Sequence, residues 1–249
     1  MAFTPVSARA DHLRMGVGDW CPYVCNPATA DGREGYLVDI FREIFENAGV
    51  SVETVFLPFA RNIQMNRTGQ LDGIIGVYRT DVRDFYFPSV HLGKGYSHFY
   101  TLRDSDWRFR DESSLASLTS LGSVKGYDYG SELLQRFIDS RPERNRVVTG
   151  NDPQQRLAQL LLRGRILAFV EDNNVASYTI ESMGVSSQVI SVGQIGGAMP
   201  VYAVFSPAMK ADRAAIYFTL LAEGLEQLRE DGRLADILGR YGVADWEKH

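Results

Sequence analysis

The stretch Asp72-Gly-Ile-Ile-Gly-Val-Tyr-Arg-Thr-Asp-Val-Arg83 places a short apolar strand directly before a polar loop that holds two arginines. Arginine presents a planar fork of donors that fits both oxygens of a carboxylate, and backbone N–H groups of a tight turn can add further hydrogen bonds. The loop therefore predicts a carboxylate receptor. The alternative is that Arg79 and Arg83 are solvated surface charges or ion-pair partners of Asp81 and Asp84.

The segments before this loop alternate between strand and helix patterns. Residues 13–18 and 50–57 predict strands that precede the one ending at the arginine loop. Residues 35–49 and 59–68 carry apolar side chains at helical spacing, and a glycine ends or follows each helix. The order strand, helix, strand, helix, strand indicates an α/β lobe.

The same order recurs in the second part of the chain. Residues 115–130 predict a strand and a loop, residues 131–138 a helix and residues 147–149 a short strand. Residues 152–163 predict another helix, and residues 164–172 repeat the glycine and buried strand found before the arginine loop. Ligands of open α/β sheets bind outside the carboxyl ends of the strands, so we expect the polar loops of two similar lobes to face one cleft.

Two extended segments predict the connections between the lobes. Residues 93–102 leave the first lobe and residues 196–205 return to it, which predicts a hinge of two crossing strands. The expected lobes are residues 1–97 with 200–249, and residues 98–199. Two C-terminal helices, at 213–229 and 234–241, should return to the first lobe, the former with an apolar stripe that includes Ile216, Leu220 and Leu228.

Length and composition exclude several classes of protein. The 249 residues suffice for two lobes that each bury a core, and a formal net charge of -5 with intermixed signs argues against a nucleic-acid partner. No apolar run is long enough to span a membrane. The four histidines are scattered, so we expect no metal site. We also expect no cofactor. Residues 2–10 are typical of the remainder of an export segment or a linker.

The only two cysteines, Cys21 and Cys25, lie close together beside Trp20. A disulfide that closes this short loop is the favoured prediction and fits an oxidising compartment. A redox-active dithiol is the alternative.

Several of these segments together resemble the bacterial extracellular solute-binding proteins of family 3. The resemblance rests on the helix at 35–49, the segment 69–76, the run Thr80-Asp-Val-Arg83 with Phe87-Pro-Ser89, and the segment 164–172, and it extends from about residue 13 to 242. The family includes periplasmic polar-amino-acid receptors of ABC transporters. The resemblance implies a two-lobe, type II periplasmic-binding-protein fold that closes on its ligand, a periplasmic location, a monomer and an ABC permease as partner.

The resemblance also assigns site residues. Arg83 falls where the family clamps the ligand α-carboxylate, with Thr80 near by, and Asp172 matches the aspartate that receives the α-ammonium. Trp20 and Phe59 match the aromatic side chains around the ligand. Each has a structural alternative: Trp20 as a core residue, Phe59 as an ordinary helix-face aromatic, and Asp172, which competes with Glu171 for the role, as an N-cap or surface charge.

The loops depart from the family pattern in their larger and charged side chains. Family receptors usually carry small hydroxyl residues in both loops, where this chain has Gly76-Val-Tyr-Arg79 and Lys125-Gly-Tyr-Asp-Tyr129. These side chains predict a ligand that is smaller, or more acidic, than a standard amino acid. The further candidate contacts are Gly76, Tyr78, Arg79, Tyr127 and Asp128.

The residues and the resemblance together predict a receptor that captures a small carboxylate-bearing polar solute, an amino acid or a related metabolite, for an importer. A ligand-sensing module of a signalling system would have nearly the same sequence, because closure is the signal in both. The rival class is an enzyme related to the cyclohexadienyl and arogenate dehydratases, which share the fold, with Glu171 as the acid. No Ser-His-Asp, Cys-His or metal-ligand set supports catalysis, so we expect no enzyme.

Overall fold

Helix α1 (Tyr36–Asn47) shows how the sequence pattern builds the first part of the fold. Its apolar residues fall on one face, and seven of them are buried, among them Leu37, Phe41 and Phe45.

The computed structural model describes residues 11–150 and 152–247, which form two compact units. Unit 1 comprises residues 11–93 and 201–247, and unit 2 comprises residues 94–200. The expected export remainder at residues 2–10 lies outside the described residues.

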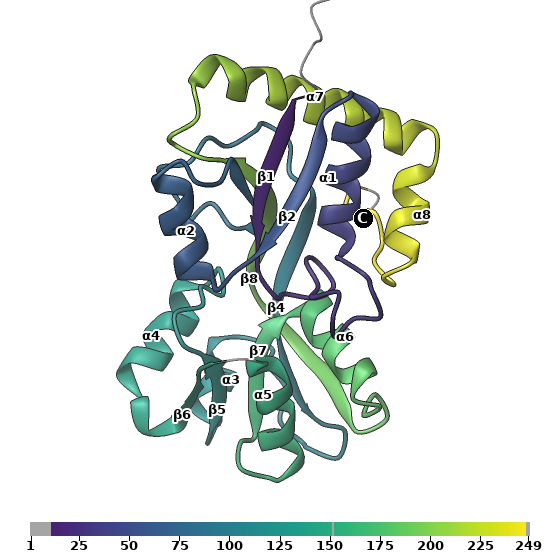
Figure 1. The fold of residues 1–249 in the computed structure, drawn as a ribbon. Helices are drawn as coiled ribbons and strands as arrows, with labels where there is room; N and C mark the ends of the chain where they lie inside the picture. The colour runs from purple at the N-terminus through teal and green to yellow at the C-terminus, as the bar shows by residue number, and fades with distance from the viewer. Residues whose placement is uncertain (1–10, 151, 248–249) are drawn as a thin grey trace, which may run out of the picture. The chain divides into compact units, whose positions relative to one another are not determined.

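Unit 1 is a mixed sheet covered by helices. Parallel strands β1 (His12–Val17), β2 (Ser51–Phe56) and β3 (Gly73–Val77) are joined by the end of β8 (Val189–Phe205), which runs antiparallel to β3, in the order β2-β1-β3-β8. Helices α7 (Ala211–Glu230) and α8 (Arg233–Gly239) contact α1, while α2 (Phe59–Arg67) contacts β1 and β3 (Figure 1). The carboxyl ends of β1, β2 and β3 therefore point the same way.

Unit 2 contains a second sheet in the order β8-β4-β7-β5-β6. Its other strands are β4 (Gly93–Leu102), β5 (Leu121–Val124), β6 (Asn145–Val148) and β7 (Ala168–Asp172), of which β5, β6 and β7 are parallel and β4 runs antiparallel to β7. Its helices are α3 (Glu112–Ala116), α4 (Glu132–Ser140), the short 3-10 helix η1 (Pro142–Arg144), α5 (Pro153–Leu162) and α6 (Asn173–Ser182).

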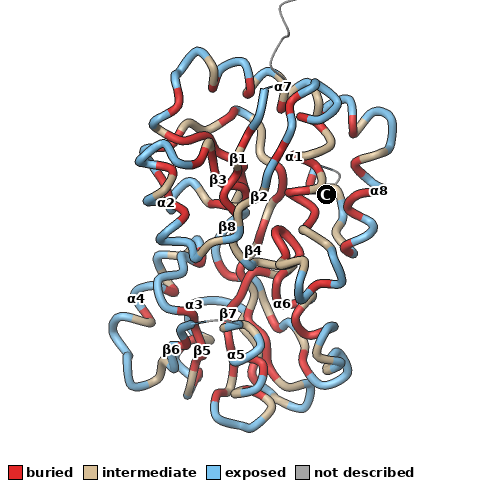
Figure 2. The backbone as a smooth tube through the Cα atoms, in the orientation of Figure 1, coloured by how far each residue is buried: buried red, intermediate tan, exposed pale blue. Residues whose placement is uncertain are grey.

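Buried residues follow the strands and the inner sides of the helices in both units (Figure 2). In unit 2 they form two clusters, one around Phe99, Leu121 and Val170 and the other around Tyr100, Leu157 and Phe169. Alternate residues of β4 and β7 thus serve opposite clusters, as expected for a strand covered on both sides. The prediction of an α/β fold is confirmed.

Three sequence expectations about elements were incomplete or wrong. The segment 115–130 was expected to begin with a strand, but Asp111 and Ser114 form a capping box that starts α3, and β5 begins only at Leu121. Helix α6 follows β7 without a loop and was not predicted, and β8 extends seven residues ahead of the expected segment, starting at Val189 instead of Gly196.

The apolar stripe expected on α7 is confirmed for Leu228, which is buried, but wrong for Ile216. Ile216 is 61% exposed, and the buried face consists of Ala214, Tyr217, Leu221, Leu225 and Leu228. The ring of Tyr217 lies 5.6 Å from that of Phe45 and 5.1 Å from that of Phe205. These aromatic contacts select the helix face that turns toward the sheet.

Candidate functional site

The loop after β3 is built on a glycine bulge. Gly76 has φ +89° and interrupts the register between β3 and β8, and a Cβ there would lie 2.9 Å from Val24 Cγ2. A side chain at this position would be strained in both backbone and packing. The turn that follows is held by the backbone N–H of Tyr78, which donates to Asp81 Oδ2 at 2.8 Å. The apolar strand therefore ends in a tightly defined polar turn.

The two arginines of this turn have different surroundings. The Arg79 guanidinium lies over the ring of Phe87 at 4.3 Å and over that of Tyr202 at 5.2 Å. Arg83 is exposed, and within the described part of the chain it forms no ion pair or side-chain hydrogen bond. Asp84, one of its expected alternative partners, is instead bound by Arg67 at 2.8 and 2.9 Å.

The two carboxylates of this loop, Asp81 and Asp84, are bound by groups other than Arg83. The Arg67 hydrogen bonds lower the pKa of Asp84, so Asp84 is ionised and already compensated. Asp81 is engaged by the Tyr78 N–H, as described above. Arg83 and the exposed Thr80 are thus presented to solvent by a loop whose own acidic groups are in use.

Aromatic side chains gather beside this loop. Trp20 is half-buried, stacks on Tyr23 with ring centroids 4.2 Å apart, and meets the edge of Tyr78 at 5.3 Å. A Cβ at Gly76 would also lie 3.9 Å from Trp20 Cε3. Unit 1 therefore brings Trp20, Gly76 and Tyr78 together. Phe59, at the start of α2, is 45% exposed.

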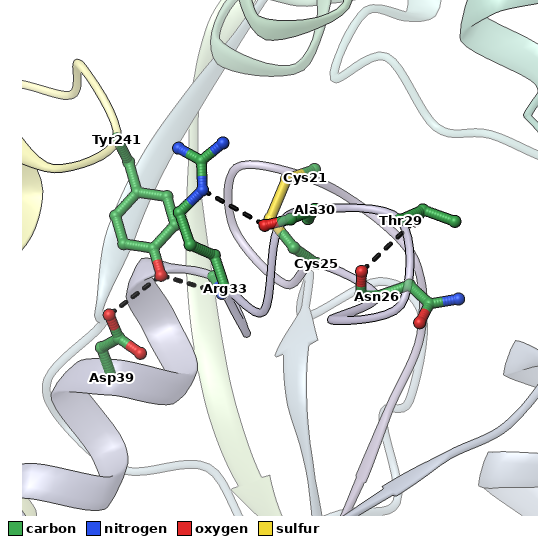
Figure 3. Close-up of a disulfide and its surroundings, with 9 residues drawn as sticks. Cys21, Cys25, Asn26, Thr29, Ala30, Arg33, Asp39 and Tyr241 are labelled. Carbon is green, nitrogen blue, oxygen red and sulfur yellow. Dashed lines mark hydrogen bonds between the residues drawn. A yellow bond between two sulfur atoms is a disulfide. The ribbon is translucent and has the colours of Figure 1, made fainter.

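A disulfide fixes the segment that carries Trp20. Cys21 and Cys25 are bonded (Figure 3), which confirms the disulfide prediction. Trp20 and Val24 exchange two backbone hydrogen bonds of 2.7 and 3.1 Å. The bonded loop is also tied to the start of α1, because Tyr23 O accepts from Leu37 N–H at 3.0 Å.

A C-terminal tyrosine anchors the other end of this segment. Tyr241 Oη accepts from the backbone N–H of Gly35 at 3.1 Å and donates to Asp39 Oδ2 at 2.9 Å (Figure 3). Burial raises the pKa of Asp39, although the hydrogen bond from Tyr241 and the nearby Arg240 oppose that change. The chain between β1 and α1 is therefore held at both ends.

The acidic residues at the end of β7 are buried. Asp172 is 3% exposed, and its Oδ1 accepts from the backbone N–H groups of Asn174 at 2.9 Å and Val175 at 3.2 Å, so the side chain caps α6. Glu171 is 2% exposed, and its Oε1 accepts from Asp172 N–H at 2.9 Å. Burial raises the pKa of Glu171 to about 8, so its carboxyl is mostly protonated at neutral pH.

Unit 2 also contains an open pocket of about 620 Å³ over the loop between β5 and α4. Tyr127 and Asp128 line it, as does the exposed Lys125. Asp128 Oδ1 accepts from Gly130 N–H at 2.8 Å, and Gln154 Nε2 donates to Tyr127 Oη at 3.3 Å. Neither Glu171 nor Asp172 is among the lining residues.

The structure thus assigns the predicted site residues to two separate groups. Unit 1 carries Arg83, Thr80, Tyr78, Arg79, Gly76 and Trp20 on or beside one loop, with Phe59 at the start of α2. In unit 2, Tyr127 and Asp128 line the pocket, and Asp172 caps α6. Their contacts with a ligand stay predictions. Lys125 was predicted only as part of a loop and was not singled out. A lysine in a glycine-containing loop after a predicted strand was the available signal in the sequence.

Metal-binding clusters and membrane-spanning helices both bear on the class of site. Among residues 11–150 and 152–247, no group of three or more His, Cys, Asp or Glu side chains is arranged to hold a metal ion. Within the same residues, no helix has the length and apolar character needed to cross a bilayer.

Solved structures share this fold at low sequence identity. A histidine kinase sensor domain similar to periplasmic binding proteins has a TM-score of 0.69 and 20% identity, with 94% of this chain and 97% of that chain covered. A mutant of the arginine-binding protein ArgBP from T. maritima has a TM-score of 0.68 and 18% identity, with 92% and 94% covered. An ancestral amino-acid-binding protein, described as a precursor of cyclohexadienyl dehydratase, has a TM-score of 0.69 and 17% identity, with 92% and 95% covered.

These neighbours are mostly binding proteins, and they show the two-lobe, type II periplasmic-binding-protein fold that the sequence predicted. No curated protein matches the chain. The family model of the bacterial extracellular solute-binding proteins, family 3, matches residues 13–244. The chain therefore belongs to the bacterial extracellular solute-binding proteins of family 3.

Proposed function

We propose that this protein captures a small carboxylate-bearing polar solute, of the class of amino acids and related metabolites, and delivers it to an ABC importer. In this proposal the protein works as a monomer in the periplasm, with a membrane permease as its partner. The observation that supports it most strongly is Arg83, an exposed guanidinium in the turn after β3 with no acidic partner in the described part of the chain.

The surroundings of Arg83 suit a carboxylate. Its planar fork can donate two parallel hydrogen bonds, and hydrogen bonds to charged groups contribute about 1.5–3 kcal/mol. The exposed Thr80 offers a hydroxyl in the same turn. Trp20, which directly precedes the disulfide-closed loop, and Tyr78 supply aromatic surface beside this turn. We propose that Arg83 anchors the solute carboxylate.

We further propose that residues of unit 2 complete the binding of the solute, with Tyr127 and Asp128 as the contacting side chains. A ligand that contacts both units would favour whichever arrangement of them makes both sets of contacts, and this is the proposed closure. That preference would be the signal that a permease reads.

A thermal-shift screen of ligand-stripped protein tests the proposal. The library contains amino acids, polyamines, dicarboxylates, tricarboxylates and aromatic acids, and we expect stabilisation by one class of carboxylates. Arg83→Ala should abolish it while the variant stays folded. Arg163→Ala is the matched control, because Arg163 is also exposed and without a side-chain partner in the described part of the chain. Loss of folding in Arg83→Ala would assign Arg83 a structural role instead.

A sensory role is the second candidate, because a histidine kinase sensor domain is among the similar structures. In that role the same solute would be bound, but the partner would be a signalling protein. Deletion of the gene distinguishes the two. Loss of uptake of the labelled solute supports transport, whereas unchanged uptake with a lost transcriptional response to the solute supports sensing.

A further inference from the structure

The loop closed by the disulfide touches the arginine turn through Val24. Val24 is 2% exposed, and a Cβ at Gly76 would lie 2.9 Å from its Cγ2. Gly76 is the bulged residue at the end of β3, so Val24 lies against the backbone bend from which the turn with Arg79 and Arg83 starts. All of these residues belong to unit 1. In a close-packed contact, the position of Val24 limits the positions that the start of the turn can take.

The opposite side of the same loop is tied to the start of helix α1. The backbone N–H groups of Tyr36 and Leu37 donate to the carbonyl oxygens of Pro22 and Tyr23, each at 3.0 Å. Because the helix holds this side of the loop, a loss of closure is expressed at the other side, where Val24 meets Gly76.

Closure on the Val24 side depends on two neighbouring links. Trp20 and Val24 exchange backbone hydrogen bonds of 2.7 and 3.1 Å, and the disulfide joins the next residues along, Cys21 and Cys25 (Figure 3). Backbone hydrogen bonds contribute little net stability where water can replace them. Without the disulfide, the Trp20–Val24 pair would therefore open more often, and Val24 would leave Gly76.

We propose that the Cys21–Cys25 disulfide and Val24 are positioning elements of the solute site, so that reduction of the disulfide weakens solute binding at the arginine turn. This inference rests on the proposed function and adds to it a dependence of the affinity on thiol redox state. A turn that is already ordered loses less conformational freedom when it binds a solute, and this difference raises the affinity of the oxidised protein.

Reduction by a dithiol proceeds by two exchange steps. Cys21 is half-buried and Cys25 is 1% exposed, so the reagent thiolate attacks the Cys21 sulfur. The disulfide bond breaks, and Cys25 leaves as a thiolate and takes up a proton. The second thiolate of the reagent then displaces Cys21, which is protonated in turn, and the reagent becomes a cyclic disulfide. Two electrons pass from the reagent to the protein.

Calorimetric titration with the most stabilising carboxylate from the thermal-shift screen tests the proposal. We expect about tenfold weaker binding by the dithiothreitol-reduced protein than by the oxidised protein. The double variant Cys21→Ser with Cys25→Ser should bind as weakly with or without dithiothreitol. Val24→Ala should weaken binding with the disulfide intact. Thermal unfolding confirms that each form is folded at the temperature of the titration.

Gly224→Ala is the control for a general loss of stability. A Cβ at Gly224 would collide with Ile44, away from the disulfide loop, so this variant is overpacked and destabilised. Its affinity for the carboxylate should equal that of the parent protein. Equal weakening in Gly224→Ala and in the reduced protein would show that the disulfide acts through stability alone, which overturns the inference.

Amide hydrogen exchange tests the positioning without a solute. Within the turn, Tyr78 N–H donates to Asp81 Oδ2 at 2.8 Å and Asp81 N–H donates to Tyr78 O at 3.2 Å. Reduction should speed exchange at these two amides and leave exchange in strand β7 of unit 2 unchanged. Unchanged exchange in the turn, or equally faster exchange in β7, overturns the inference.

The remaining outcomes separate the two proposals. Equal affinity of the oxidised and reduced proteins overturns the positioning role and leaves the receptor function in place. Failure of every solute in the library to bind folded, oxidised protein overturns the proposed function, and the redox-dependent affinity with it.

Discussion

Glu171 couples the stability of the fold to pH. Its pKa is about 8 in the folded protein, raised from 4.5 by burial, and the neighbouring Asp172 carboxylate acts in the same direction. Between these two pKa values the folded state binds more protons than the unfolded state. The free energy of unfolding therefore falls as pH rises through this window, by up to about 1.4 kcal/mol per pH unit, and levels off above it.

Glu171→Gln should remove this dependence. The amide keeps the shape of the neutral carboxyl, so we expect little difference from the parent protein at about pH 5 and a more stable variant at about pH 8.5. Urea unfolding at both pH values measures the difference. Asp172, Tyr100 and Tyr129 are the titratable groups that interact electrostatically with this acidic pair. All three are present in both proteins, so the comparison isolates the effect of Glu171. Parallel pH profiles would show that Glu171 is charged in the folded state.

Gly224 allows the close approach of helices α7 and α1. A Cβ at this position would collide with the side chain of Ile44 on α1. Alanine has the better helix propensity by about 1 kcal/mol, but overpacking costs about 1–3 kcal/mol. We therefore expect Gly224→Ala to lower the free energy of unfolding.

Gly239→Ala is the matched control for this substitution. Gly239 also lies in a helix, α8, and apart from its chain neighbours and the backbone of its own helix no atom lies within 4 Å of the position that its Cβ would take. This variant should be neutral or slightly stabilised. Denaturant unfolding of both variants gives the comparison, and equal stability of the two would show that α7 and α1 adjust without cost.

At the scale of elements, the segment between β1 and α1 depends on its disulfide. Cys21 and Cys25 close a five-residue loop, for which the loop-entropy model gives about 2 kcal/mol. Reduction, or the double variant Cys21→Ser with Cys25→Ser, should lower stability by about that amount. Denaturant unfolding with and without reductant measures it. The double variant should not respond to reductant, and a parent protein that is equally insensitive would contradict the expected contribution.

The sequence predicted those elements whose signals are local. Helices α1 and α2 and strands β1 to β3 match their periodicity and glycine stops, because apolar spacing directly reflects a buried face. Helix α6 was missed because its cap, Asp172, is also the last residue of β7, so no polar loop separates the two elements. The exposure of Ile216 was missed because Phe45 and Phe205, distant in sequence, determine which face of α7 is buried.

The features of the candidate site also fall into those with local sequence signals and those that depend on residues distant in sequence. The arginine turn and the disulfide follow from adjacent residues and were predictable. The position of Arg79 over Phe87 and Tyr202 was not, because Tyr202 reaches it from β8. The compensated state of Asp84 depends in turn on Arg67 of α2. A sequence pattern identifies charged residues, but only the fold shows which of them are already paired.

At the scale of the whole molecule, the chain forms two compact units, and the residues named in the proposed function are divided between them. The chain passes between them twice, between Gly93 and Lys94 and between Pro200 and Val201. A solute that binds only the folded protein should raise its stability by about 2.7 kcal/mol at 100 times its dissociation constant. A rise in the unfolding temperature is therefore the expected sign of the ligand.

The most direct test of the account is a calorimetric titration of ligand-stripped protein and Arg83→Ala with the most stabilising carboxylate from the screen. We predict one saturable site per chain, an affinity about 100-fold lower in Arg83→Ala, and an unchanged affinity in Arg163→Ala. Equal affinity in folded Arg83→Ala, or no saturable binding by the parent protein, would contradict the claim that this chain is a carboxylate receptor anchored by Arg83.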